Sequence, residues 1–324
     1  MAGTTAETRG GSPRGLGTEV LLVLGVSLGA SAVYAVVRLA DRLTRAETLA
    51  SQSTTLNASV SDRPWLDLLY QLLDIGFTLV PAALALFLLG GRSIRAGARV
   101  IGMGLHGPTE PTAQAAEPAV DPYEGSAQRG TAAPVAGDVP GGRPARGAQA
   151  ELRARARVPG VRRRPAPDTW RRQLGHGVVL FAVIGAPGLA FYALGRAAGL
   201  TVAVQASGLS GAWWTVPVLA LAALKNGLLE EVVVVGYLVE RLETIGWSGR
   251  RVVVLSAVLR GCYHLYQGVG PGIGNLVMGL VMAGYYRRTR RTWPLVVAHS
   301  LLDVVAFVGY AVVPATWLAW LGLT

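Results

Sequence analysis

The sequence predicts an all-α fold, a polytopic transmembrane helical bundle of about seven spans with a long disordered cytoplasmic loop. Only 15% of the 324 residues are charged and 51% are hydrophobic, whereas a soluble domain has about 25% charged residues. The polar surface is therefore too small to cover a water-soluble globule. The apolar residues also gather in runs near the ~20 residues that an α-helix needs to cross a bilayer.

Two spans are expected in the N-terminal part of the chain. Residues 1–15 are polar and Gly-rich, which predicts a disordered tail. Residues 16–90 hold two transmembrane helices, roughly Val20–Leu39 and Leu66–Leu89, joined by polar residues 41–64. We expect the first run to be a retained span, because it has no small-residue cleavage site of the kind that ends a signal peptide.

Residues 91–174 have a different composition. They are rich in Ala, Pro, Gly and Arg and hold almost no large apolar side chains. Such a segment cannot bury enough surface to offset its chain entropy, so a disordered basic linker is predicted. Within it, Arg92–Gly104 fits a short basic helix that continues the second span.

The remaining spans fall in residues 175–313, and residues 314–324 form an apolar tail too short to cross again, which is expected to lie at an interface. The expected spans are His176–Gly199, Trp213–Arg241, Arg251–Tyr266, Ile273–Tyr286 and Trp293–Val313.

The arginines orient these spans, since cytoplasmic loops carry an excess of basic residues. With seven spans and a cytoplasmic N-terminus, the Arg-rich segments all fall on the cytoplasmic side; they are residues 1–15, 91–174, 241–251 and 287–291. Segments 200–212 and 267–272 have no Arg or Lys and fall outside; segment 41–64, which also falls outside, carries three arginines partly offset by acids.

This orientation also accounts for the net charge of +11. The Arg runs lack the aromatic pattern of a nucleic-acid-binding protein, so no nucleic-acid partner is predicted. The expected partners are the lipid bilayer and a membrane-associated protein or peptide substrate. The expected location is the cell membrane of a bacterium, because the Ala, Gly, Arg and Val content is typical of a high-GC genome.

Ionisable residues inside spans are costly and therefore mark functional candidates. The candidates that we single out lie in three spans, as Glu230 with Glu231, Arg260 with His264, and His299 with Asp303. Counted at ~1.5 Å per residue from the nearest cytoplasmic arginine, Glu230, His264 and His299 lie about 16, about 20 and about 12 Å deep. They therefore share one layer near the middle of a ~30 Å hydrocarbon core.

The two carboxylates are the hardest of these groups to explain structurally. Each costs roughly 2.5–3.5 kcal/mol in an apolar helix, whereas a single His or Asp is also explained as a helix-packing hydrogen bonder. Glu230 and Glu231 diverge by about 100° on a helix and cannot both point at one atom. One is expected to face the reacting centre and the other a cation, with Arg260 and Lys225 as candidate counterions.

At these residues the chain resembles the CPBP family, which includes the type II CAAX prenyl endopeptidases and Abi-like bacterial proteins linked to bacteriocin processing and immunity. The family pattern is EExxxR, then FxxxH, then HxxxN or HxxxD. The corresponding segments here are EEVVVVGY from Glu230, RGCYHLYQG from Arg260 and HSLLD from His299 to Asp303. The resemblance covers about residues 175–312.

The chain departs from the family pattern at two positions. Val235 stands where the first motif has Arg, and Arg260 stands where the second motif has an aromatic residue. One guanidinium is lost and another appears in the same layer. Our hypothesis is that Arg260 replaces the missing charge and pairs with Glu231.

The resemblance implies an intramembrane endopeptidase with Glu230, Glu231, His264, His299 and Asp303 as catalytic residues. Glu230 would activate a water shared with His264, since a carboxylate in an apolar pocket is a better base. His299 and Asp303 would orient the substrate or hold the oxyanion side.

A zinc ion is the rival version of this mechanism. Glu230, His264 and His299 would then be its ligands, with an open position for water. The sequence lacks HExxH, so these ligands would come from separate helices. The metal-bound and metal-free mechanisms both remain open at this point.

Two other functions also fit the residues. Intramembrane Glu and His occur in transporters and proton relays, although no inverted repeat or broken helix pair supports transport here. The altered first motif leaves room for a non-catalytic immunity or scaffold protein. The sequence does not name the substrate, and prenylated proteins are not expected in a bacterium.

Overall fold

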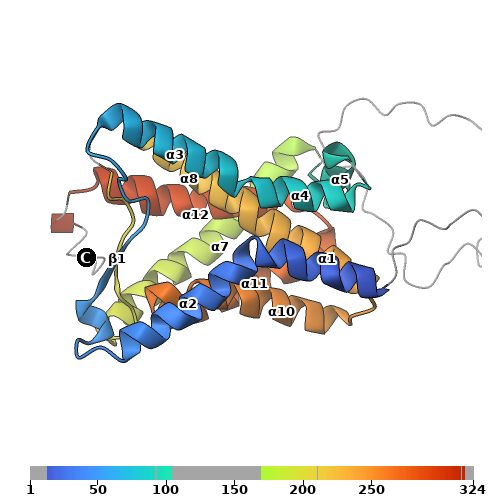
Figure 1. The fold of residues 1–324 in the computed structure, drawn as a ribbon, viewed down its shortest axis with the longest axis horizontal. Coiled ribbons are helices and arrows are strands. Elements are labelled where there is room, and N and C mark those ends of the chain that lie inside the picture. The colour runs from blue at the N-terminus through green and yellow to red at the C-terminus, as the bar shows by residue number, and fades with distance from the viewer. Residues whose placement is uncertain (1–12, 92, 104–168, 210, 315, 318–324) are drawn as a thin grey trace, which may run out of the picture. The chain divides into compact units, whose positions relative to one another are not determined.

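The computed structural model describes residues 13–91, 93–103, 169–209, 211–314 and 316–317. In these residues the protein is a bundle of α-helices with a single two-stranded sheet (Figure 1). The prediction of a helical fold is confirmed for this part of the chain. The predicted disordered tail and most of the predicted basic linker lie outside the described residues.

The first predicted span is broken. Its place is taken by α1 (Pro13–Gly25) and α2 (Leu28–Leu43), whose axes differ by 55°. The hydroxyl of Ser27 donates to the carbonyl oxygen of Val23 at 2.5 Å, inside the break. Sharp kinks in helices occur at Gly and Ser positions of this kind, so the residues predicted as one span, Val20–Leu39, form a bent pair of helices that counts as one broken span or a re-entrant loop.

The second span is present as α3 (Pro64–Thr78) and α4 (Val80–Leu89). After it, α5 (Ile94–Val100) lies against α4 so closely that a Cβ on Gly97 would be 1.8 Å from the carbonyl oxygen of Leu86. The short basic helix expected within Arg92–Gly104 therefore exists, but it packs onto α4 and does not extend it.

The C-terminal part contains the long helices. In chain order they are α7 (Trp170–Ala197), α8 (Thr215–Glu230), η2 (Glu231–Tyr237), α9 (Leu238–Thr244), α10 (Gly249–Tyr263), η3 (Leu265–Gln267), α11 (Val269–Thr289) and α12 (Trp293–Val312). The segment η2 is a π-helix that joins α8 to α9 without a break. The short 3-10 turn η1 (Leu49–Ser51) lies between α2 and the first strand.

Loops that are far apart in the sequence meet at one end of the bundle. There β1 (Ser53–Thr55) pairs in parallel with β2 (Ala203–Gln205), and Thr201 forms a bridge with Gly268. These are the segments predicted to lie outside. The opposite end, near α5, joins predicted cytoplasmic segments: the Thr292 amide donates to Ile101 O at 3.0 Å (Figure 1). Which end faces the cytoplasm remains a prediction.

The predicted count of about seven spans is not confirmed. Among the described residues three helices are long and apolar enough to cross a membrane, namely Pro64–Leu89, Trp170–Ala197 and Trp293–Val312; the bent α1–α2 pair raises the count to four. The helix α10 has 15 residues, about 22 Å of helix, which is short of a ~30 Å hydrocarbon core. The described residues nevertheless contain three or four candidate membrane spans.

The most buried part of the bundle surrounds the π-helix. Val233, Val234, Val235 and Tyr237 are fully buried, and Ile101 of the segment after α5 packs against Gly236. Helix association within a bilayer depends on close packing, because lipid tails are as apolar as these side chains. The packing around η2 therefore holds the glutamate-bearing helix in place.

Candidate active site

The π-helix begins at the glutamate pair. Glu230 ends α8 and Glu231 is the first residue of η2. Both are buried, with 8% and 0% of their surfaces exposed. Single π-turns inside α-helices occur frequently at functional sites. Here the hydroxyl of Ser256, on α10, donates to the carbonyl oxygen of Val234 at 2.8 Å, which ties the π-helix to the helix that carries Arg260.

Arg260 lies between the two carboxylates. Its Nη2 donates to Glu231 Oε1 at 2.5 Å, and its Nη1 is 3.6 Å from Glu230 Oε2. The guanidinium is fully buried. The pairing of Arg260 with Glu231 is the one predicted from the sequence. Both glutamates approach this one guanidinium, each at a different nitrogen, whereas only one of them was expected to face the cation.

The other candidate counterion has a different partner. Lys225 Nζ lies 2.8 Å from Asp74 Oδ2, so this lysine joins α8 to α3. Its pairing with the glutamates was a wrong prediction. Lys225 is five residues before Glu230 in the sequence, and that offset places it on another side of α8.

His299 connects both glutamates to α12. Its Nδ1 lies 2.8 Å from Glu231 Oε1, and its Nε2 lies 3.9 Å from Glu230 Oε2 and 3.8 Å from Asp303 Oδ1. A carboxylate accepts hydrogen bonds, so Nδ1 carries the proton and Nε2 faces the other two acids. His299 and Asp303 share one face of the helix, as their spacing predicted.

His264 lies just past the end of α10, not within a span as expected. Its Nδ1 is 3.0 Å from the carbonyl oxygen of Arg260, which acts as an acceptor. That bond leaves Nε2 with its lone pair as the available acceptor. The ring of His264 is 4.8 Å from the ring of Tyr263, whose hydroxyl binds Glu230.

Two polar residues of the site were missed by the sequence analysis. The Tyr263 hydroxyl donates to Glu230 Oε2 at 2.6 Å, and Asn226 Nδ2 donates to Asp303 Oδ2 at 2.9 Å. Asn226 is four residues before Glu230, on the same face of α8. The spacing of Asn226 from Glu230 could have predicted that this amide belongs to the site. Nothing in the sequence position of Tyr263 indicated a contact with Glu230.

Small residues bring α8 close to α12, and α11 close to α10. A Cβ on Gly227 would lie 2.5 Å from Ser300 Oγ of α12, and a Cβ on Gly279 would lie 2.7 Å from the Cα of Ala257. Close backbone approach at small residues is typical of membrane helix pairs. A larger residue at Gly227 would push α12, and with it His299, away from the glutamates.

The site retains buried hydrogen-bonding capacity. Among the described residues, Glu231 Oε2, Arg260 Nε and Ser300 Oγ are buried and have no hydrogen-bond partner in the protein. Buried polar groups of this kind are normally satisfied. The arrangement therefore offers acceptors and donors to a small polar molecule within an apolar interior.

The residues proposed as zinc ligands do not form a metal site in this arrangement. No group of three His, Cys, Asp or Glu side chains among the described residues converges on one point. The Arg260 guanidinium stands beside both glutamates, and the Tyr263 hydroxyl already binds Glu230 Oε2. A cation placed there would be repelled by Arg260, so we derive no step through a metal.

A comparison with known protein families gives a match in the region of the candidate active site. The family model described as "Type II CAAX prenyl endopeptidase Rce1-like" matches residues 212–305, less than half of the chain. The matched segment contains every site residue described above. It is consistent with the CPBP resemblance, so the prediction of a CAAX-protease-like domain is confirmed for these residues. No curated protein and no solved structure matches the chain.

Proposed function

We propose that this protein is an intramembrane endopeptidase that hydrolyses peptide bonds of membrane-associated substrates, with Glu230 as the general base. The observation that carries the proposal is the burial of Glu230 among Tyr263, His299 and Arg260 within an Rce1-like segment. Buried carboxylates without a chemical role are rare because they are costly.

In the proposed reaction a water molecule lies between Glu230 and His264. Glu230 takes a proton from the water while the water oxygen attacks the carbonyl carbon of the peptide bond. The protonated Glu230 then donates that proton to the departing amine nitrogen, and a carboxylic acid and an amine are released. General acid–base catalysis of this kind contributes about 10²–10⁴-fold to a rate.

The remaining residues have positioning and electrostatic roles in this proposal. Glu231 accepts hydrogen bonds from Arg260 and His299 through the same oxygen, Oε1. This arrangement directs His299 Nε2 toward the space beside Glu230, where it can donate to the developing oxyanion when it is protonated. Asp303, held by Asn226, favours that protonated form of His299.

The test is proteolysis by the purified protein in liposomes, measured with a pool of internally quenched peptides that carry an apolar membrane anchor. Wild type should cleave some of these peptides, and Glu230→Gln should lose at least 100-fold in kcat while remaining folded. Glu47→Gln, at an exposed loop position, is the matched control and should keep full activity. Equal activity in wild type and Glu230→Gln would refute the proposal.

A proton relay is the second candidate, because polar groups continue from the site toward α3. Asp303 binds Asn226, and the adjacent Lys225 binds Asp74 of α3. Linked ionisable groups of this kind also occur in pumps and transporters. Proton flux measured in the same liposomes separates the two functions: flux that is lost in Glu230→Gln, with no peptide cleavage by wild type, would favour the relay.

A further inference from the structure

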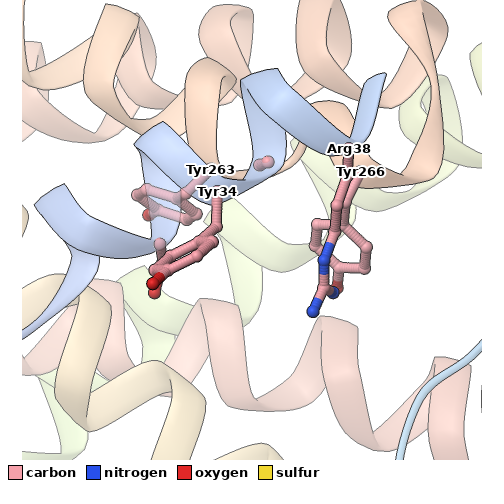
Figure 2. Close-up of a pocket in the computed structure, with 6 residues that line it drawn as sticks. Tyr34, Arg38, Tyr263 and Tyr266 are labelled. Carbon is pink, nitrogen blue, oxygen red and sulfur yellow. The ribbon is translucent and has the colours of Figure 1, made fainter. Parts of the chain in front are cut away.

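A pocket of about 270 Å³ lies between α2 and the end of α10, next to the candidate active site. Its lining residues are Ser31, Tyr34, Ala35, Arg38, Tyr263 and Tyr266. Figure 2 shows Tyr34 and Tyr263 on one side, with Arg38 and Tyr266 on the other. Its volume is close to the lower limit of small-ligand sites, ~300–1,000 Å³, so it suits a headgroup-sized molecule.

Arg38 supplies the only charge in this lining. Among the described residues no acid pairs with Arg38, whereas Arg42 on α2 and Arg45, just after the end of α2, have partners. Arg42 donates to Ser53 O at 3.2 Å, and Arg45 forms an ion pair with Asp41. The pocket therefore presents an unneutralised guanidinium beside three phenol groups, and an anionic group is the complementary ligand.

The pocket borders an exposed and largely apolar face of α2. Tyr34 is 69% exposed, and Val33 and Val37 on the same helix are 66% and 62% exposed. The helix α2 belongs to a candidate membrane span. Arg38 lies about 7.5 Å along the axis from the end of α2 at Leu43, at the end of the bundle where β1 lies. That depth matches the headgroup region, where Arg and Tyr side chains contact lipid phosphates.

We propose that this pocket binds the phosphate of a membrane phospholipid, with Arg38 as the anion-binding residue, Tyr34 and Tyr266 as hydroxyl donors, and Tyr263 as an aromatic wall. Gln267 Nε2 donates to the Tyr266 hydroxyl at 2.8 Å, which leaves the hydroxyl hydrogen of Tyr266 available for a phosphate oxygen. The glycerol and acyl chains would lie along the exposed apolar face of α2.

The site has a direct connection to the candidate base. Tyr263 forms part of the pocket wall, and its hydroxyl donates to Glu230 Oε2. A lipid bound against Tyr263 restricts the motion of this ring. Occupancy of the pocket is thereby coupled to the hydrogen bond on Glu230, although lipid binding itself does not depend on the protein being a protease.

The test is binding of a short-chain phospholipid, dihexanoyl phosphatidylglycerol, to the full-length protein in neutral detergent. Arg38→Gln should weaken binding by about 10- to 100-fold, the value of a lost charge-assisted hydrogen bond. Arg42→Gln is the matched control, one turn further along α2 and bonded outside the pocket, and it should change the affinity less than about twofold.

Three further measurements identify the ligand. Tyr34→Ala should also weaken binding if the phospholipid enters the pocket; an unchanged affinity would mean that Arg38 only reaches nonspecifically to headgroups, and the proposal would be wrong. Dihexanoylglycerol, which lacks the phosphate, should not bind. The lipid is also competed with millimolar inorganic phosphate and with a peptide that has a free carboxyl terminus. If either competitor binds with the same affinity as the lipid, the assignment to phospholipid is overturned.

Discussion

The buried ion pair between Arg260 and Glu231 allows a quantitative prediction. Replacing Arg260 with Met removes the cation and leaves the fully buried Glu231 carboxylate with His299 as its remaining partner. Breaking a buried pair by removing one partner costs about 3–5 kcal/mol. For a protein of 324 residues, whose unfolding entropy is about 2.1 cal/mol/K per residue, that loss lowers the thermal midpoint by roughly 4–7 °C.

A double variant distinguishes the cost of an unpaired buried charge from the cost of altered packing. Glu231→Gln together with Arg260→Met removes both charges, and replacing a buried pair by neutral groups of similar volume is often close to neutral. The double variant should therefore recover most of the stability that the single Arg260→Met variant loses. Its peptidase activity should stay low, because His299 has lost the carboxylate that orients Nδ1.

The assay is thermal unfolding of the protein in detergent, followed by tryptophan fluorescence, alongside peptide cleavage in liposomes. Arg290→Met is a useful comparison, because Arg290 also bonds two glutamates but at the end of the bundle, where its side chain is 17% exposed. If Arg260→Met keeps wild-type stability and activity, the reasoning that Arg260 compensates the buried charge is refuted.

Three further predictions concern the hydroxyl of Tyr263, an acidic cluster and metal dependence. Tyr263→Phe removes the 2.6 Å hydrogen bond to the buried Glu230 and should lower kcat by roughly 10-fold or more, with a smaller loss of thermal midpoint than Arg260→Met. Burial by itself raises the pKa of Glu243, but hydrogen bonds from Arg290 and Arg287 hold that pKa below its ordinary value. A carboxyl group with a lowered folded-state pKa stabilises the protein above its unfolded-state pKa and loses that effect as the pH falls through the folded-state value. The difference in thermal midpoint between wild type and Glu243→Gln should therefore be present at neutral pH and should shrink once the pH falls below about 4.3, the ordinary pKa of Glu. Incubation with a chelator should leave peptide cleavage unchanged, since the candidate ligands do not converge on one point; loss of activity that added zinc restores would contradict this.

Much of the helical architecture could be predicted from local sequence. Runs of apolar residues bounded by arginines placed the last helix within a residue of α12, and the two termini of α3–α4 within two residues. Depth counted from flanking arginines put Glu230 and His299 in one layer, and their side chains lie 3.9 Å apart. These predictions worked because a bilayer imposes one fixed thickness on every span.

Other features depend on contacts that a local pattern does not encode. The strands β1 and β2 are about 150 residues apart in the chain and pair only because the bundle brings their loops together. The π-helix at Glu231 carries no local composition signal; it is supported by Ser256 from another helix. The partner of Lys225 was missed for the same reason, because Asp74 lies in a distant span.

Contacts between helices also account for the position of the arginine that pairs with Glu231. The family pattern has this arginine at the position of Val235, whereas here the partner of Glu231 is Arg260. A carboxylate at Glu231 needs a cation within hydrogen-bond distance, but that cation can come from the helix of Glu231 or from a neighbouring helix. On the same helix it would stand four residues on, at Val235; here it comes from α10. If this equivalence is correct, Val235→Arg combined with Arg260→Phe should regain stability that Arg260→Phe alone loses. Stability is measured by thermal unfolding. If the double variant is no more stable than Arg260→Phe alone, the packing around the fully buried Val235 does not accommodate a guanidinium.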